Sequence, residues 1–228
     1  MVSVSVSELQ VLVEAEYGRL ELPSWPNPHA GMFPPDENEY SRVTDPERYR
    51  IVHARASVWA AVLEDALDVS SETLAAAGGA ERPHGFDRGV GLIPCQPGTL
   101  PLFLLERDVP TQTPTGEGTL ALLDIGVGRP DIVVSMQPDC GCDACDSGSS
   151  DLLEAIDARI RHVVGGPFVV LRGTTWRAEW HPGGGSAGGE GCRPDFRQVM
   201  ELCRRLAASD IVHLPEDTEA LVGQSWLS

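Results

Sequence analysis

Three cysteines within six consecutive residues are the clearest chemical signal in this sequence. The segment Pro138–Asp146 reads Pro-Asp-Cys-Gly-Cys-Asp-Ala-Cys-Asp, so Cys142 and Cys145 have the two-residue gap of a zinc knuckle, and Cys140 adds a third thiol. This gap lets two sulfurs converge on one ion, each at about 2.3 Å from zinc. A helix that begins after the turn would place its positive end near the sulfurs and favour thiolates. The spacing therefore predicts zinc as the cofactor, with these three cysteines as ligands.

A tetrahedral zinc site needs a fourth ligand, which must come from another part of the chain. Cys192 and His181 flank the segment 182–191, which holds six glycines in ten residues and is predicted to be a loop. Cys192 is the first choice for the fourth ligand and His181 the second, with Cys95 as a third option. A structural zinc ion bound in this way would pin the glycine-rich loop, whose ordering otherwise costs conformational entropy. The sequence thus favours a structural metal in a binding or interaction protein.

A zinc-dependent enzyme is the main alternative, because an ion with three protein ligands keeps one position open for water. In the expected strand 175–181, alternation places Arg177, Glu179 and His181 on one face. Glu179 would then serve as general base and His181 as acid or metal ligand, acting on a small substrate. The simpler interpretation of these side chains is a solvent-exposed strand face with a cross-strand ion pair.

A thiol redox switch is the second alternative, and it requires a cysteine of low pKa and no metal. An iron–sulfur cluster and a turn of inert thiols are two further interpretations, although the spacing fits no standard cluster motif. Three acids of the turn, Asp139, Asp143 and Asp146, either add negative charge near an ion or cap the following helix. Cys203 lies on the apolar face of the last expected helix and is predicted to be a core residue.

Apolar periodicity and capping residues predict four helices and several short strands around these motifs. The helices are expected at about 8–19 with Ser7 as cap and Gln10 at the third position, from Thr44–Glu47 to Ala66, at 150–164 and at 195–208. Leu9, Leu12, Val13 and Tyr17 form the apolar stripe of the first helix. The strands are expected at 90–93, 100–106, 119–125, 131–136, 168–172 and 175–181. Because strands follow one another rather than alternate with helices, the predicted class is α+β, with a mainly antiparallel sheet of about five to six strands and a metal-pinned cysteine turn.

Length and charge limit the domain organisation and the class of partner. The 228 residues suit a single α+β domain over 1–228, in which residues 1–40 form a helical arm with a proline-rich crossing that packs on its own chain or on a second copy in a homodimer. All 17 basic residues are arginines, and 34 acids bring the net charge to −17. A chain this acidic is not expected to bind nucleic acid or to enter a membrane. The expected partner is a cationic protein or a small molecule, and the lack of a secretory signal predicts a cytoplasmic location.

The chain resembles an actinobacterial family of unknown function. The resemblance rests on the turn Pro138–Asp146, the helix Leu152–Val164 and the segment Glu179–Pro182 with the glycines that follow it. It implies no activity. It does imply that the cysteine turn and the glycine-rich segment occur together, which favours Cys192 or His181 as the distal ligand.

Overall fold

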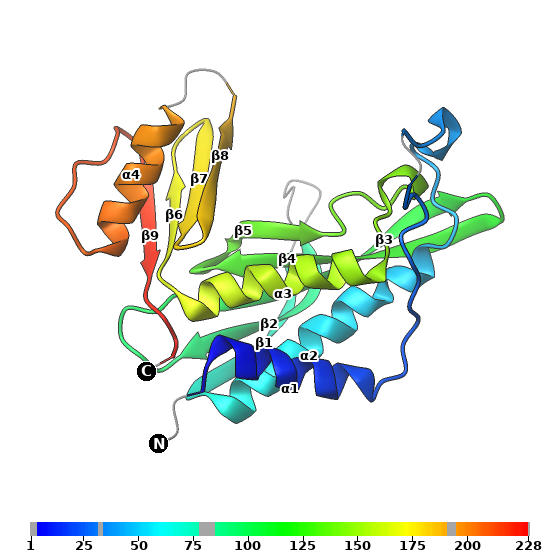
Figure 1. The fold of residues 1–228 in the computed structure, drawn as a ribbon, viewed down its shortest axis with the longest axis horizontal. Coiled ribbons are helices and arrows are strands. Elements are labelled where there is room, and N and C mark those ends of the chain that lie inside the picture. The colour runs from blue at the N-terminus through cyan, green and yellow to red at the C-terminus, as the bar shows by residue number, and fades with distance from the viewer. Residues whose placement is uncertain (1–3, 32–33, 78–84, 191–194, 228) are drawn as a thin grey trace.

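A computed structural model describes residues 4–31, 34–77, 85–190 and 195–227 and places them in an α+β fold (Figure 1). The described residues contain four α-helices and two antiparallel sheets. This confirms the predicted α+β class and the predicted number of helices. The helices are α1 (Val6–Gly18), α2 (Ile51–Ala66), α3 (Ser149–Gly165) and α4 (Phe196–Ala207). Three short 3-10 helices are η1 (Glu37–Glu39), η2 (Pro46–Arg50) and η3 (Asp143–Cys145).

The first sheet has five strands in sequence order, β1-β2-β3-β4-β5, all antiparallel. The strands are β1 (Val69–Ala77), β2 (Phe86–Pro94), β3 (Leu102–Thr113), β4 (Gly116–Val127) and β5 (Arg129–Gln137). Helices α2 and α3 cover one face of this sheet, and α1 packs on both of them (Figure 1). The main core lies in this layer and includes the fully buried Trp59, Leu104 and Ile156.

The second sheet has four strands in the order β8-β7-β6-β9, also antiparallel. The strands are β6 (Phe168–Arg172), β7 (Trp176–His181), β8 (Gly184–Gly189) and β9 (Glu219–Gly223). Helix α4 covers one face of this sheet, where Val169, Ala178 and Cys203 form a small core of their own. The predicted strands are therefore divided between two sheets, which α3 connects (Figure 1).

The glycine-rich segment is a strand and not the loop that the sequence predicts. Residues Gly184–Gly189 form β8 and pair with β7 from His181 to Trp176. The lack of a side chain at Gly185 lets α4 approach this strand closely, since a Cβ there would lie 2.6 Å from the sulfur of Met200. Backbone hydrogen bonds to β7 and close packing thus order this segment without any metal.

Helix α1 begins two residues earlier than the sequence predicts. Ser5 is the cap, because its hydroxyl accepts a hydrogen bond from the backbone N–H of Glu8 at 3.2 Å. The Glu8 carboxylate accepts one from the Ser5 N–H at 2.8 Å, which completes a capping box and lowers the pKa of Glu8. Leu9 and Val13 are buried as expected, but Leu12 is 44% exposed. The predicted apolar stripe is thus wider than the buried face of the helix.

The last described residues lie against the end of α3 and complete the main core. Trp226 is 2% exposed, and its backbone N–H donates to the carbonyl of Val164 at 2.9 Å. The N–H of Gln224 donates to the carbonyl of Gly98 at 2.8 Å, so the segment after β9 also contacts the β2–β3 connection. None of the helices in the described ranges has both the length and the apolar character needed to cross a bilayer.

Candidate metal centre

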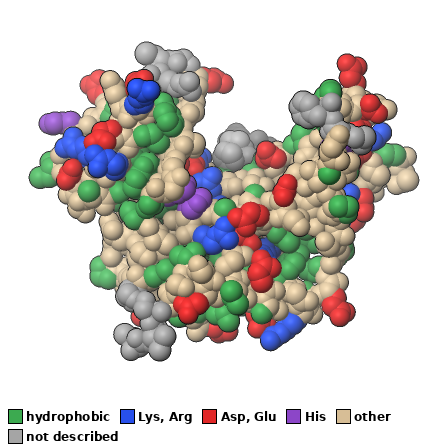
Figure 2. All heavy atoms as spheres, in the orientation of Figure 1, with side chains coloured by type: hydrophobic (Ala, Val, Ile, Leu, Met, Phe, Trp, Pro, Cys, Tyr) green, Lys and Arg blue, Asp and Glu red, His purple; other side chains and the backbone are tan. Residues whose placement is uncertain are grey.

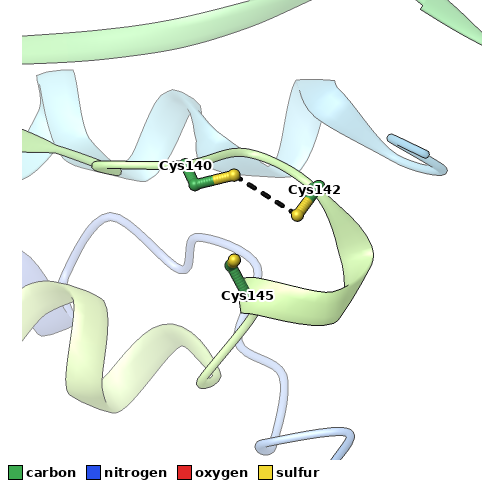
Figure 3. A group of neighbouring side chains, drawn as sticks. All are labelled: Cys140, Cys142 and Cys145. Atoms are coloured by element: carbon green, nitrogen blue, oxygen red, sulfur yellow. Dashed lines mark hydrogen bonds between the residues drawn. The ribbon is translucent and has the colours of Figure 1, made fainter. Parts of the chain in front are cut away.

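The cysteine turn (Pro138–Asp146) connects the end of β5 to the start of α3. Its three sulfurs point toward one another, and all lie within 4.8 Å of each other (Figure 3). The thiol of Cys140 donates a hydrogen bond to the sulfur of Cys142 at 3.3 Å. Cys142 is buried, whereas Cys140 and Cys145 are exposed. The structure therefore brings together the three cysteines that the sequence selects.

The thiols of the turn differ in their acidity. Burial disfavours the thiolate of Cys142, but hydrogen bonds from the Cys140 and Cys145 thiols and from the backbone N–H groups of Ser41 and Cys145 outweigh it and lower its pKa. The hydrogen bond to Cys142, together with burial, raises the pKa of Cys145 to about 12. The hydrogen bonds within the turn therefore favour the thiolate of the buried Cys142 and disfavour that of Cys145.

Asp143 ties the turn to a segment about a hundred residues earlier. Its carboxylate accepts hydrogen bonds from Arg42 Nε at 2.7 Å and from the Thr44 backbone N–H at 2.9 Å and hydroxyl at 2.5 Å. The Asp143 N–H donates to the carbonyl of Arg42 at 2.7 Å. Burial works against the carboxylate, but the bonds from Thr44 and Arg42 hold the pKa of Asp143 below its usual value. The side chain of Asp143 is therefore an anchor of the turn and not a metal ligand.

Asp146 makes the second anchor. Its carboxylate, 3% exposed, accepts hydrogen bonds from Trp25 Nε1 at 3.0 Å, from Arg48 Nη2 at 2.6 Å and from the Gly148 N–H at 2.8 Å. The Arg48 guanidinium lies over the rings of Trp25 and Tyr49, at 4.8 and 5.2 Å from their centroids. The proline-rich crossing is thus fixed against the cysteine turn and the start of α3.

Two glycines let the backbone pass through this junction. Gly148 precedes α3 with φ +89°, and a Cβ there would lie 2.6 Å from the backbone nitrogen of Asn27. Gly141 separates two of the cysteines, where a Cβ would lie 2.5 Å from Leu120. Close packing rather than a left-handed turn therefore accounts for glycine at position 141.

A cavity of about 230 Å³ lies beside the turn. Cys140 and Cys145 line it, together with three carboxylate residues, Asp139, Asp146 and Asp151. Cys142 is buried and does not line the cavity, so the cavity lies on the side of the turn where Cys140 and Cys145 are exposed. A metal held by the three sulfurs would have room for a further ligand on the cavity side.

His181 lies far from the cysteines. Its ring stacks on the ring of His162, with centroids 3.5 Å apart and planes at 17°. His162 belongs to the last turn of α3, whereas the cysteines precede its first turn, so about 20 Å of helix separates the two places. The structure does not bring His181 to the metal centre. Cys192, the first choice for the fourth ligand, lies outside the described residues.

Glu179, the predicted general base, is held in ion pairs at the same distant end of α3. Arg159 of α3 donates to its carboxylate at 2.5 Å, and Arg177 makes a second ion pair with it. Glu179 is 7% exposed. The strand face that carries Glu179 and His181 therefore packs against α3 instead of facing solvent, and its ion pair extends to a helix.

The other described cysteines are separate from this group. Cys203 is fully buried in the small core under α4, which confirms its prediction as a core residue, and burial raises its pKa to about 12. Cys95 is exposed near Asp68, whose negative charge raises the pKa of the thiol. Within the described ranges, neither approaches the three sulfurs of the turn.

The residues that hold the turn in place are not among those that the sequence predicts to belong to the site. Trp25, Arg42, Thr44 and Arg48 contact it from 98 to 121 residues away. The Thr44–Glu47 pattern predicts the start of a helix, but it does not predict that Thr44 contacts the cysteine turn. No local spacing could have identified these partners.

Comparison with known proteins identifies a family but no activity. Residues 13–228 match the model of a family of unknown function (DUF6226). Neither the curated proteins nor the solved structures contain a match to the chain.

Proposed function

This chain belongs to DUF6226, whose function is unknown, and we propose that its cysteine turn binds one zinc ion through Cys140, Cys142 and Cys145. The observation that carries the proposal is the separation of the three sulfurs, all within 4.8 Å. Tetrahedral zinc with bonds of about 2.3 Å places its sulfurs about 3.8 Å apart. Small side-chain rotations are enough to reach that spacing from the present arrangement.

The ligand type favours zinc over other common cations. Thiolates are soft ligands that select zinc or copper(I), whereas magnesium and calcium take oxygen ligands. Two carboxylates of the turn, on Asp143 and Asp146, are already used by arginines and backbone N–H groups. Sulfur is therefore the ligand that this site offers.

The geometry supports a structural role for the zinc ion at the junction of the cysteine turn and the proline-rich crossing. Gly184–Gly189 is ordered by β7, so the predicted role of zinc in ordering this segment has lost its basis. Asp143 and Asp146 already fix the ends of η3, and the metal would join the remaining side of the turn. Zinc would then add stability to a turn that is already shaped, in a binding or interaction protein.

Water, a carboxylate and Cys192 are the candidates for the fourth ligand. The cavity side of Cys140 and Cys145 offers room for water or for a carboxylate, and Cys192 stays a predicted ligand. An enzyme in which Glu179 and His181 act on a metal-bound substrate gains no support, because both lie at the other end of α3.

Metal analysis of protein purified without a histidine tag tests the proposal. We expect about one equivalent of zinc in the wild type, loss of most of it in Cys142→Ser and Cys145→Ser, and full retention in the matched control Cys95→Ser. Partial loss in Cys192→Ser would identify the fourth ligand. Metal-free wild-type protein from zinc-supplemented cultures would refute the proposal.

A thiol switch is the second candidate, and one contact favours it. The sulfurs of Cys140 and Cys142 are 3.3 Å apart, and Cys142 has the lowered pKa of a reactive thiol. Peroxide would oxidise the two thiols to a disulfide and be reduced to water. Mass spectrometry of the metal-free protein distinguishes the candidates: a reversible disulfide that forms faster than any modification of Cys95 supports the switch.

A further inference from the structure

An apolar groove lies between α1 and α2, and none of its lining residues belongs to the cysteine turn or to the residues that anchor it. It has a volume of about 540 Å³ and is lined mainly by alanine, valine and leucine: Leu12, Leu20, Ala54, Val58, Ala61, Val62 and Ala66, with Ser57, Glu16 and Asp65. The α2 residues recur at intervals of three and four, so they form one face of that helix. From Ala54 to Ala66 this face is about 18 Å long, or roughly three helical turns.

The groove exposes large apolar side chains that nothing in the described residues covers. Leu12 is 44% and Leu20 is 48% exposed, and both line it. Leu12 belongs to the apolar stripe of α1, of which Leu9 and Val13 are in the core. Clustered apolar exposure of this kind marks interaction surfaces more often than scattered single residues do.

The two charged residues that line the groove, Glu16 and Asp65, are both acidic. Asp65 has no ion-pair partner among the described residues, and Glu16 pairs only with Arg19, whose side chain is 71% exposed. No arginine lines the groove. The whole chain carries a charge of −17, which draws cations toward it and repels a second copy or an anionic lipid surface.

We propose that this groove binds a basic amphipathic helix of a partner protein. The apolar face of such a helix would cover Leu12, Val58 and Ala61, and its flanking Lys or Arg side chains would pair with Glu16 and Asp65. Grooves between two helices accept a third helix through anchors spaced at i, i+3 or i+4, and i+7, which a segment of about three turns supplies. The proposal is independent of the zinc site, because none of the groove residues contacts the cysteine turn.

A synthetic probe tests this proposal directly. The probe is a fluorescein-labelled helix of about four turns with Leu at i, i+4, i+7 and i+11 and Lys or Ala elsewhere, and its control is the same composition in scrambled order. We expect the wild type to bind the amphipathic probe at least about tenfold more tightly than the scrambled one, with weaker binding at higher salt. Equal binding of the two peptides would show charge attraction alone and would overturn the proposal.

Variants locate the binding on the protein. Leu12→Glu and Ala61→Glu should each weaken binding of the probe about tenfold, although each adds a negative charge. Ile211→Glu adds the same charge at a 98% exposed residue outside the groove and should change affinity less than about twofold. If Leu12→Glu fails to fold by circular dichroism, the exposed Ala61 decides the outcome. Unchanged affinity in Ala61→Glu, or a wild-type dimer that this variant dissociates, would overturn the proposal.

Discussion

Arg55 of α2 and Asp157 of α3 form an ion pair inside the main core. Arg55 Nη2 lies 2.5 Å from Asp157 Oδ2, and the two side chains are 1% and 2% exposed. Trp59 Nε1 donates to the same carboxylate at 2.6 Å, and Gln10 of α1 donates to it at 2.8 Å. One carboxylate therefore connects α2 and α3, which cover the first sheet, with α1, which packs on them.

Removal of that charge should destabilise the protein strongly. Asp157→Asn leaves a buried guanidinium without its main counterion, so we expect the free energy of unfolding to fall by about 3 kcal/mol or more. Urea denaturation measures the change. Arg204→Ala, which breaks the exposed pair with Glu201, is the matched control and should cost less than about 1 kcal/mol. A small effect of Asp157→Asn would show that the pair is replaceable by neutral hydrogen bonds.

Asp146 should couple the metal centre to the proline-rich crossing. In Asp146→Asn the half-buried Arg48 loses its ion pair and the turn loses one anchor, so we expect a loss of about 2 kcal/mol in stability and a lower zinc affinity. Calorimetric zinc titration and urea denaturation measure the two effects. Asp139→Asn, at an exposed residue of the same turn, should leave stability unchanged. Normal zinc affinity in Asp146→Asn would mean that the sulfurs are positioned without this anchor.

Gly148 should accept no side chain. Gly148→Ala places a methyl group against the backbone of Asn27 at a φ of +89°, so we expect a loss of about 2 kcal/mol or more. Gly18→Ala is the control, because a Cβ there meets nothing within 4 Å and alanine favours a helix. Thermal unfolding of the two variants should show a lower Tm for the first and an equal or higher Tm for the second. Equal Tm values would contradict the close contact at the start of α3.

Acid should weaken the contact between α3 and the second sheet. Burial, with the neighbouring His181, Arg159 and Arg161, lowers the pKa of His162 from 6.5 to about 4. The unfolded chain then binds a proton that the folded protein excludes, so the contribution is constant above pH 6.5 and stability is lost as the pH falls from 6.5 toward 4. His162→Phe keeps a stacking ring without a titrating group and should flatten the pH dependence of unfolding in that range. His213→Gln, at an exposed residue, should leave this pH dependence unchanged. Equal slopes in the wild type and in both variants would show that His162 is not the titrating group.

Metal removal should lower stability without loss of the fold. Because Asp143 and Asp146 hold the turn independently, a chelator should leave the far-ultraviolet circular dichroism spectrum unchanged. Zinc at a hundred times its dissociation constant would add about 2.7 kcal/mol, so chelation should lower Tm by several degrees. Cys142→Ser should show no response to the chelator. Complete unfolding of the wild type on chelation would show that the anchors alone cannot shape the turn.

The parts of the fold that were predictable from sequence are those that local pattern determines. The buried faces of α2 and α3 follow the periodicity of residues such as Val52, Trp59 and Ile156, and the cysteines were recognised from spacing alone. The predicted start of α1 was wrong because Ser5 and Ser7 are both acceptable caps. The capping box that forms joins Ser5 to Glu8.

Long-range packing determined the rest. Gly185 of β8 lies in close contact with Met200 of α4, and nothing within 184–189 indicates a strand. The anchors of the cysteine turn, such as Arg48 on Asp146, join positions 98 residues apart. His181 was a candidate ligand because it flanks the glycine-rich segment, and only the length of α3 shows how far it lies from the cysteines.

The placement of Trp226 has a consequence for how the molecule is made. Its side chain fills the main core beside the end of α3, and its backbone bonds to Val164. A nascent chain that has emerged only as far as β8 still lacks this indole and leaves apolar surface of the first layer open to water. The core is therefore completed only when residue 226 has left the ribosomal tunnel, long after synthesis of the first sheet.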